Sequence, residues 1–149
     1  MRHSLRRANA ADTEPIAGLH HRAWQEAYGS PPPGGSLLVA DEGLTVVAEN
    51  EAGELSGFCA LVFPSRDDDA DNVTCEVAAL YVEPGRWRWG IGRALMRTTL
   101  DQATGQGYEV VTLWLPEPND GARKFFESFG FKPDDAIDGG SVRMRLTLA

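Results

Sequence analysis

The order of the predicted strands and helices indicates an α/β fold in a single domain that spans residues 1–149. A chain of 149 residues with 42% hydrophobic content supports one core and is too short for two. Segments rich in β-forming residues and segments with helical periodicity follow one another in the order β-α-β-β-β-α-β-α-β. Because the second to fourth strands are consecutive, the sheet is expected to begin antiparallel and to be covered by helices.

The N-terminal part begins with a short strand over Leu5–Ala8, followed by a helix. Asp12 is placed to cap a helix over Thr13–Tyr28, and Pro15 is tolerated in its first turn. Gly29 and the prolines after it end this helix, and residues 29–35 are expected to form a loop. The residues that recur at helical spacing and mark its buried stripe are Ile16, Leu19, His20, Ala23, Trp24 and Ala27.

Three strands are expected next. Leu44–Ala48 and Leu55–Phe63 flank Asn50–Gly53, which is a hairpin signal. Ser65–Asn72 carries four aspartates and is expected to be a solvated loop. Val73–Val82 has an almost unbroken apolar second half, as expected of a central strand.

The C-terminal part alternates helix and strand. The expected elements are a helix over Gly90–Thr104, a buried strand over Val110–Leu115, a helix capped by Asn119 or Asp120 that runs through Ser128, and last strand material at Phe131 and Val142–Leu148.

Composition narrows the function classes. A net charge of −8 argues against nucleic acid as a partner and favours a cationic small molecule or a basic peptide. No stretch of eighteen apolar residues exists, so no membrane span is expected. The basic N-terminus is not followed by an apolar stretch of signal-peptide length, so a cytoplasmic protein is expected.

The metal-binding residue types are sparse. Cys59 and Cys75 are the only cysteines, so they support neither a disulfide framework nor a four-cysteine metal site, and free buried thiols are expected. His20 and His21 are adjacent, and no helical pair of ligands four residues apart is present. No metal site is therefore expected.

A glycine pair follows the long central strand. Gly90 and Gly92 lie at a strand-to-helix junction, where the main chain can approach a ligand closely. The first turn of the helix also presents N–H groups and the positive end of its dipole, which favours an anion. Arg86, Arg88 and Arg93 concentrate positive charge there in an acidic chain. These features fit a diphosphate, although an ordinary glycine turn is the alternative for two glycines alone.

Two nucleotide-binding interpretations fail on the residues around this pair. A dinucleotide fingerprint needs a third glycine three residues after Gly92, where Leu95 stands. The chain also lacks the Gly-Lys-Ser/Thr ending of a P-loop. The loop alone therefore indicates an anion site without identifying the anion.

Two longer blocks carry a more specific pattern. In Glu76–Met96, Leu80-Tyr81-Val82 is followed by a proline two residues on, and then by Gly90-Ile91-Gly92 and Ala94-Leu95. Further on come Leu113, Asn119, Ala122, Phe125, Phe126 and Gly130-Phe131, in the spacing Asn-x-x-Ala-x-x-Phe-Tyr-x-x-x-Gly-Phe with phenylalanine at the tyrosine position. Both blocks resemble those of the GNAT superfamily of N-acetyltransferases, and with the N-terminal strand and helix the resemblance covers most of the chain.

The resemblance implies a GNAT-like mixed central sheet of six to seven strands with helices on both faces. It also implies acetyl-CoA as cosubstrate, no metal, and direct transfer of the acetyl group to a primary amine. The Leu80 N–H would stabilise the oxyanion, and Val82 main-chain groups would hold the pantetheine arm. The residues expected to contact the cofactor are Leu80, Tyr81, Val82, Trp87, Arg88, Trp89, Gly90, Ile91, Gly92, Arg93, Asn119, Phe125 and Phe126.

Two positions depart from the family pattern. Trp87 stands where the family often has Gln or Arg, although the nearby Arg86 or Arg88 can restore the charge. Phe126 stands where many relatives carry a tyrosine that protonates the departing thiolate, and a phenyl ring has no proton to give.

Amine acetylation needs a proton acceptor, because an alkylamine with a pKa near ~10 is protonated at neutral pH. Glu76 is the only carboxylate inside the central strand, so it is the candidate base; the alternative is a carboxylate near the strand end that is exposed or paired with an arginine. For release of the thiolate, Tyr28, Tyr81, water and departure of the thiolate itself remain open. Strand alternation should point Tyr81 away from the face of Leu80.

The acceptor is expected to contact the first helix and the loop after it. Candidate residues are His20, His21, Trp24 and Tyr28, with Phe63 opposite, although a helical stripe with His20 and Trp24 also suits a core. The aspartates of the Asp67–Asp71 segment lie opposite, where they either form a solvated loop or attract a cation.

An N-acetyltransferase is the leading interpretation. The alternatives are a GNAT-like domain that binds acyl-CoA as a sensor without transfer, for which Phe126 argues, and a nucleotide-binding domain. A monomer or a homodimer is expected.

Overall fold

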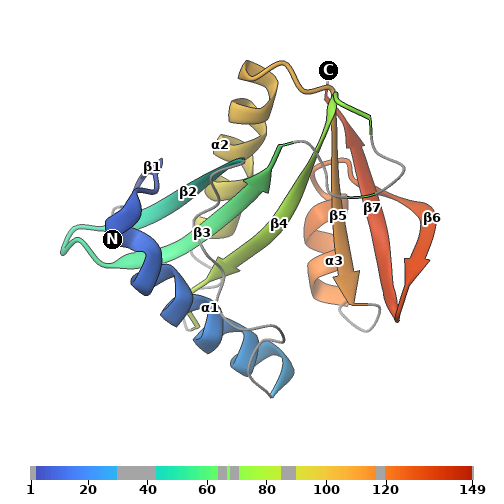
Figure 1. Ribbon diagram of the computed structural model, residues 1–149. Coiled ribbons are helices and arrows are strands. Elements are labelled where there is room, and N and C mark those ends of the chain that lie inside the picture. Colours follow the sequence, from blue (N-terminus) through green and yellow to red (C-terminus); the bar gives the residue numbers. More distant parts are fainter. Residues whose placement is uncertain are drawn as a thin grey trace.

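A seven-stranded sheet in the order β1-β2-β3-β4-β5-β7-β6 forms the centre of the protein (Figure 1). The computed structural model describes residues 3–29, 43–63, 67, 71–84, 90–116 and 120–148. The strands are β1 (His3–Arg7), β2 (Gly43–Asn50), β3 (Leu55–Val62), β4 (Thr74–Val82), β5 (Val110–Pro116), β6 (Lys132–Asp138) and β7 (Ser141–Thr147). The helices are α1 (Thr13–Tyr28), α2 (Ile91–Gly105) and α3 (Asp120–Glu127), and a 3-10 turn covers Ala10–Asp12.

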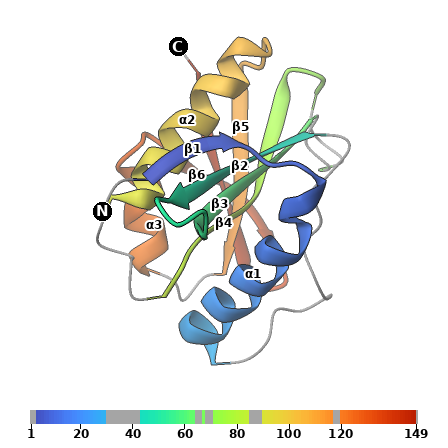
Figure 2. The ribbon, with the colours of Figure 1, turned by 90° about the vertical axis from the view of Figure 1, so that its left-hand side faces the viewer.

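The sheet is mixed. β1 to β4 are antiparallel neighbours, β4 and β5 are parallel, and β5, β7 and β6 are again antiparallel. Helix α1 covers one face, and α2 and α3 cover the other (Figures 1 and 2). The predicted α/β class, strand number and helices on both faces are confirmed.

Each face of the sheet has its own apolar core. Under α1, a smaller cluster joins Ile16, Leu19 and Ala23 of the helix to Val47, Phe58, Ala60 and Ala79 of the sheet. Under α2 and α3, a larger cluster includes Leu95, Met96, Leu113, Phe126 and Met144, all of them buried. The predicted stripe of α1 is confirmed at Ile16, Leu19, His20 and Ala23, which are buried, while Trp24 is half-buried.

Turn residues end the elements where the sequence predicts. Gly29 ends α1 in a left-handed conformation with φ 73°, and its N–H donates to the Gln25 carbonyl. In the β2–β3 hairpin, the Asn50 side chain accepts hydrogen bonds from the N–H groups of Ala52 and Glu54. Cys59 and Cys75 are free and buried, as expected, and burial raises the pKa of both thiols to about 12.

Asp12 is the N-cap residue of α1, as predicted, but its side chain makes no capping hydrogen bond to the helix. Its carboxylate accepts two hydrogen bonds from Arg6, at 2.8 and 3.0 Å, and one from the N–H of Asn9 at 2.8 Å. The Arg6 guanidinium is the main reason that the pKa of Asp12 is lowered, against the opposing effect of burial. Asp12 therefore ties β1 to the start of α1.

The edge strand β6 is absent from the sequence-based prediction. Its sequence contains Pro133 and three aspartates, residue types that are depleted in strands. It lies at the edge of the sheet, where a proline is tolerated because one side of the strand needs no ladder hydrogen bonds. Pairing with β7 makes this segment a strand against its local preference.

A buried arginine on β7 joins the segment between β3 and β4 to the other half of the sheet. Arg143 is 7% exposed and contacts Asp134 at 2.7 Å and Asp67 at 3.3 Å. Asp67 also accepts a hydrogen bond from the Trp114 indole at 3.0 Å. The expectation of a solvated aspartate loop is therefore wrong for Asp67; Asp71 is exposed, and residues 68–70 lie outside the described part.

Replacing Asp12 tests the tie between β1 and α1. Asp12→Asn should lower the free energy of unfolding by about 1–2 kcal/mol near pH 7, because it removes charge-assisted hydrogen bonds. Since folding lowers the pKa of Asp12, the wild-type advantage is complete above the unfolded value of ~3.9 and disappears as the pH falls through the lower folded value. Urea unfolding near pH 7, 5 and 3 measures this; Asp101→Asn, at an exposed site, is the control, and equal effects of both variants would refute the tie.

Replacing Arg143 tests the second connection. Arg143→Met should lower the free energy of unfolding by about 2–4 kcal/mol, because it leaves two mostly buried carboxylates without their main partner. Arg123→Met removes an exposed ion pair with Glu127 and should change the free energy of unfolding by less than about 0.5 kcal/mol. Thermal and urea unfolding measure both; similar stabilities of the two variants would contradict the role of Arg143.

Candidate functional site

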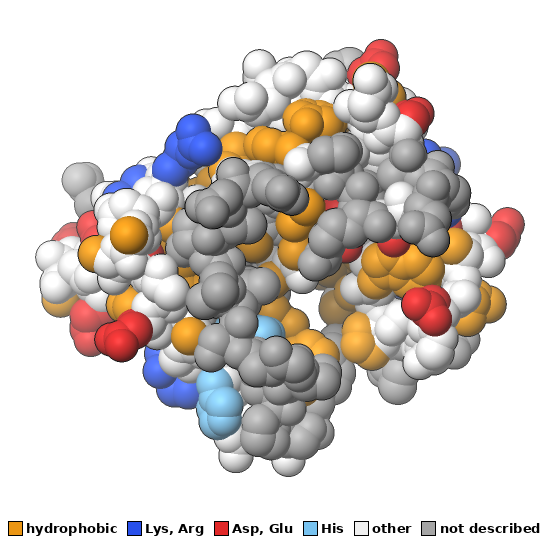
Figure 3. Space-filling model, in the orientation of Figure 1, with side chains coloured by type: hydrophobic (Ala, Val, Ile, Leu, Met, Phe, Trp, Pro, Cys, Tyr) orange, Lys and Arg blue, Asp and Glu red, His pale blue; other side chains and the backbone are white. Residues whose placement is uncertain are grey.

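The two halves of the sheet separate between β4 and β5. These parallel strands pair with each other only from Thr74–Val110 to Glu76–Thr112. Beyond this point β4 continues to Val82 and β5 to Pro116, but the two strands no longer pair with each other. Figure 1 shows the two strands diverging from their paired ends. A cavity of about 830 Å³ lies between them, within the size range of ligand sites. The space-filling view shows a hollow with hydrophobic side chains around it (Figure 3).

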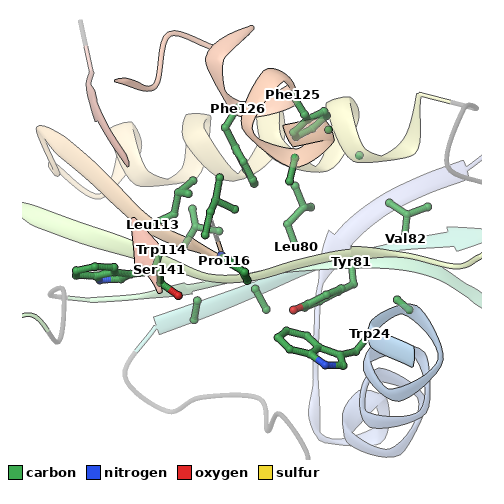
Figure 4. Close-up of a pocket in the computed structure, with 18 residues that line it drawn as sticks. Trp24, Leu80, Tyr81, Val82, Leu113, Trp114, Pro116, Phe125, Phe126 and Ser141 are labelled. Carbon is green, nitrogen blue, oxygen red and sulfur yellow. The ribbon is translucent and has the colours of Figure 1, made fainter. Parts of the chain in front are cut away.

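A bulge in β4 controls which side chains reach each face. Val77 pairs with Leu61 and Ala79 with Ala60, so Ala78 is an extra residue. Before the bulge, Cys75 and Val77 belong to the core under α2. After the bulge, Leu80 and Val82 belong to that core, whereas Ala79 and Tyr81 pack under α1. The structure confirms that Tyr81 and Leu80 point to opposite faces (Figure 4).

The main chain of β4 can be oriented from one hydrogen bond. The N–H of Glu83 donates to the Ser56 carbonyl at 2.7 Å, so this pair belongs to the hydrogen-bonded positions of the β3–β4 ladder. In an antiparallel ladder these positions alternate with non-bonded ones. Leu80 and Val82 occupy non-bonded positions opposite Cys59 and Gly57, so their main-chain groups face the gap on the β5 side.

The wall of the cavity under α2 and α3 is apolar. Its residues include Leu80, Val82, Gly92, Phe125 and Phe126. A Cβ at Gly92 would lie 3.6 Å from the Phe125 ring and 3.7 Å from Val82, so a larger side chain would fill the space in front of this wall. Phe126 is 7% exposed and packs edge-to-face on Phe125 and Phe131, with ring centroids 5.2 and 5.7 Å away, respectively.

The start of α2 opens next to this wall. Gly90 precedes the helix with φ 77°, and no side chain caps the first turn, which contains no acidic residue. The Arg93 side chain donates to Ser128 at 3.2 Å and lies 4.8 Å from the centre of the Phe129 ring. Arginine is thus present where α2 meets the end of α3. The predicted contacts Trp87, Arg88, Trp89 and Asn119 lie outside the described residues.

The opposite wall, under α1, is aromatic. Trp24 and Tyr81 line the cavity and lie side by side, with ring centroids 6.3 Å apart (Figure 4). Behind them, His20 and Phe58 are buried, with their rings 4.7 and 5.8 Å from that of Tyr81. Burial, and to a lesser extent the nearby His21, lower the pKa of His20, which favours its neutral form. Small residues, Ala23, Ala78 and Ala79, complete this wall.

Glu76 stands at the last paired position of β4 and β5, opposite Thr112. It is 6% exposed, so the prediction of a buried carboxylate agrees with the structure and the exposed alternative does not. It lies two positions before the bulge and alternates with Cys75 and Val77, so its side chain is on the α1 face, as is that of Tyr81.

The candidate acceptor residues do not all come together. Trp24 lines the cavity, but Phe63 belongs to the core under α2, where it stacks on Tyr108 at 4.7 Å and 13°. It is not among the described residues of the cavity, so the structure separates Phe63 from Trp24. The Tyr28 side chain lies outside the described part.

Several cavity residues are absent from the sequence-based prediction. They are Ala23, Val77, Ala78, Ala79, Leu113, Trp114, Leu115, Pro116, Gly121, Ala122 and Ser141. Those of β5 and β7 become cavity residues because the sheet separates, which no local pattern of residues signals. In the described part of the chain, no group of His, Cys, Asp and Glu is arranged to hold a metal ion, and no helix is long and apolar enough to cross a membrane.

Comparisons with known proteins agree with this geometry. Residues 5–131 match the family described as the acetyltransferase (GNAT) family. An uncharacterized N-acetyltransferase of Methanocaldococcus jannaschii is 31% identical over 64 residues, which are 43% of this chain and 28% of that protein. A mycothiol acetyltransferase of Thermobispora bispora is 34% identical over 80 residues, 54% of this chain and 27% of that protein. The matched part is thus about a quarter of the length of these curated relatives.

A solved structure shares the fold over the whole chain. The PaiA N-acetyltransferase of Thermoplasma acidophilum, in complex with coenzyme A, superposes with a TM-score of 0.81 at 17% identity, covering 99% of this chain and all of that one. At this identity the likeness shows the fold alone. The family match over residues 5–131, together with the mixed sheet that separates after Glu76, shows that this chain belongs to the acetyltransferase (GNAT) family.

Proposed function

We propose that the protein transfers the acetyl group of acetyl-CoA to a primary amine by direct attack, in the cavity between β4 and β5. The observation that carries this proposal is that β4 and β5 stop pairing at Glu76 and Thr112, and that the main-chain groups of Leu80 face the resulting gap. An extended thioester arm fits such a gap, because its amides can pair with a strand that has lost its neighbour.

The residues present suit acetyl-CoA. The gap has an apolar wall for the arm, and the main chain of Leu80 and Val82 offers hydrogen-bonding groups along it. At the same wall, α2 begins with a left-handed glycine and a first turn without acidic side chains, which favours a pyrophosphate. A family relative of the same fold was solved with coenzyme A. We assign cofactor contacts to Leu80, Val82, Gly92 and Phe125. The contacts expected from Trp87, Arg88, Trp89 and Asn119, which lie outside the described residues, remain part of the proposal.

In the proposed reaction, acetyl-CoA supplies the group that is transferred and the protein stabilises the charge that develops. Bound acetyl-CoA supplies the acyl group, so that a C–N bond forms while the C–S bond breaks. The Leu80 N–H is the group that would stabilise negative charge on the carbonyl oxygen, because it faces the gap and is held by the ladder with β3. The attacking amine must lose protons, and the departing sulfur must gain one or leave as a thiolate.

Glu76 is our candidate for the proton acceptor. It is buried and lies on the α1 face, the side on which Trp24 and Tyr81 line the cavity. Ala78 and Ala79 lie between Glu76 and the aromatic pair along the strand, and both line the cavity. In this proposal an amine bound on this face would pass its proton to Glu76, directly or through water.

Among the described residues of the α3 wall that line the cavity, none offers a proton donor to the sulfur. Phe126 is buried between aromatic neighbours at the position where many relatives carry tyrosine. Among the described cavity residues, hydroxyl groups belong to Tyr81 and Ser141. This apolar α3 wall is the observation that favours the second candidate function, an acyl-CoA-binding domain that transfers nothing.

Thiol release from acetyl-CoA in the presence of a panel of primary amines separates the two functions. For the wild type, we expect thiol release that depends on the amine. The Gly92→Trp variant should lose both this release and the binding of coenzyme A, because the indole would fill the cavity in front of Phe125. Gly105→Trp, at an open position near the end of α2, is the matched control and should bind normally.

Calorimetric binding of coenzyme A by all three proteins accompanies the assay. Tight binding without release for any amine would leave the acyl-CoA-binding domain as the function. Normal binding by a folded Gly92→Trp variant would show that the cavity is not the cofactor site.

The pH dependence of turnover tests Glu76. Glu76→Gln should lower kcat/KM by about 10²-fold near neutral pH, where the amine is protonated, and by less near pH 9, where more of the amine is neutral. Glu127→Gln, at an exposed position of α3, should leave the profile unchanged. A pH–rate profile of Glu76→Gln that matches the wild type would show that Glu76 is not the base.

A further inference from the structure

We infer that the acceptor is an arylalkylamine, whose aromatic ring binds against Trp24 and Tyr81 on the α1 side of the cavity. This inference rests on the proposed function and names the substrate class of the same site. It follows from the rings that line this wall, the residues that hold them in place, and the charges around them.

The two rings belong to one aromatic cluster. Trp24 and Tyr81 lie 6.3 Å apart at 54°, so they present an angled surface rather than a flat one. His20 contacts both, at 6.1 Å from Trp24 and 4.7 Å from Tyr81, and Phe58 lies 5.8 Å from Tyr81. His20 and Phe58 are 8% and 0% exposed, so the cavity-lining pair rests on a buried pair. Aromatic rings held at such distances favour a further ring that packs edge-to-face or offset.

The position of the cluster relative to β4 fits a short aryl chain. Tyr81 directly follows Leu80, whose main chain faces the gap, and the two side chains point to opposite faces (Figure 4). A ring bound on Tyr81 therefore lies one residue from the place of the thioester. Ala78 and Ala79 extend from there toward Glu76 and leave space on the same face for an aminoalkyl chain.

The charges near the cluster do not suit a polycation. In the described part of the chain, every cavity-lining side chain is uncharged. Arg22, two residues before Trp24, pairs with Glu83, two residues after Tyr81, through contacts at 3.0 and 2.8 Å, so each charge neutralises the other. The described cavity-lining side chains offer no carboxylate to the additional amines of a diamine or an aminoglycoside, whereas an aryl group would gain the apolar surface of two rings.

Three primary amines distinguish these cases: the monoamines 2-phenylethylamine and 2-cyclohexylethylamine, and the diamine 1,4-diaminobutane. We expect 2-phenylethylamine to have the highest kcat/KM, about tenfold above the diamine. Trp24→Ala should lower kcat/KM for 2-phenylethylamine by about tenfold, mainly through KM, and Trp24→Phe should restore most of it. The KM for acetyl-CoA should stay within about twofold. Tyr108→Leu removes a ring that lies outside the cavity lining and is the control.

Calorimetric titration of 2-phenylethylamine into the complex with coenzyme A provides a second readout. If no amine is acetylated but 2-phenylethylamine binds the wild type and not Trp24→Ala, the aryl site is correct and the proposed transfer is wrong. If amines are acetylated with the diamine equal to or better than 2-phenylethylamine, or if Trp24→Ala affects all three amines equally, the transfer stands and the aryl site is refuted. Absence of both turnover and binding refutes the aryl site as well.

Discussion

The early end of the hydrogen-bonding between β4 and β5 is the constraint on which the site depends. Parallel strands in a covered sheet normally stay paired, because unpaired main-chain groups inside a protein are costly. Here pairing stops at Glu76 and Thr112 although both strands continue. The gap places the main chain of Leu80 beside a cavity, where a ligand with its own amides can pair with it.

The surrounding structure keeps the two half-sheets in this arrangement. The α2 core joins Val46 of β2 and Cys75 of β4 to Leu113 of β5 and Met144 of β7, so the halves share one apolar layer. Asp67, from the segment between β3 and β4, reaches Trp114 and Arg143 across β4 and connects the halves a second time. The bulge at Ala78 then determines which side chains of β4 lie on each face: Leu80 and Val82 under α2, and Ala79 and Tyr81 under α1.

The sequence predicts the elements better than the site. Helical spacing and glycine signals locate α1 and α2 to within a residue or two, and the spacing from Leu80 to Gly92 identifies two residues that do line one wall. Phe63, a candidate acceptor residue, lies in the core under α2, because residue type does not reveal which face of the sheet a side chain at a strand end occupies. The cavity residues Trp114 and Ser141 are missed because separation of the strands is a tertiary effect. The bulge and β6 are missed for related reasons: a bulge reverses alternation without a residue signature, and β6 forms by pairing despite Pro133.

A crystal structure of the protein with acetyl-CoA would show directly where the thioester binds. We expect the pantetheine arm to lie between β4 and β5, with its amides bonded to the β4 main chain and the thioester oxygen within hydrogen-bond distance of the Leu80 N–H. Acetyl-CoA bound on any other surface, or β4 and β5 paired along their full length with the gap closed, would contradict this expectation.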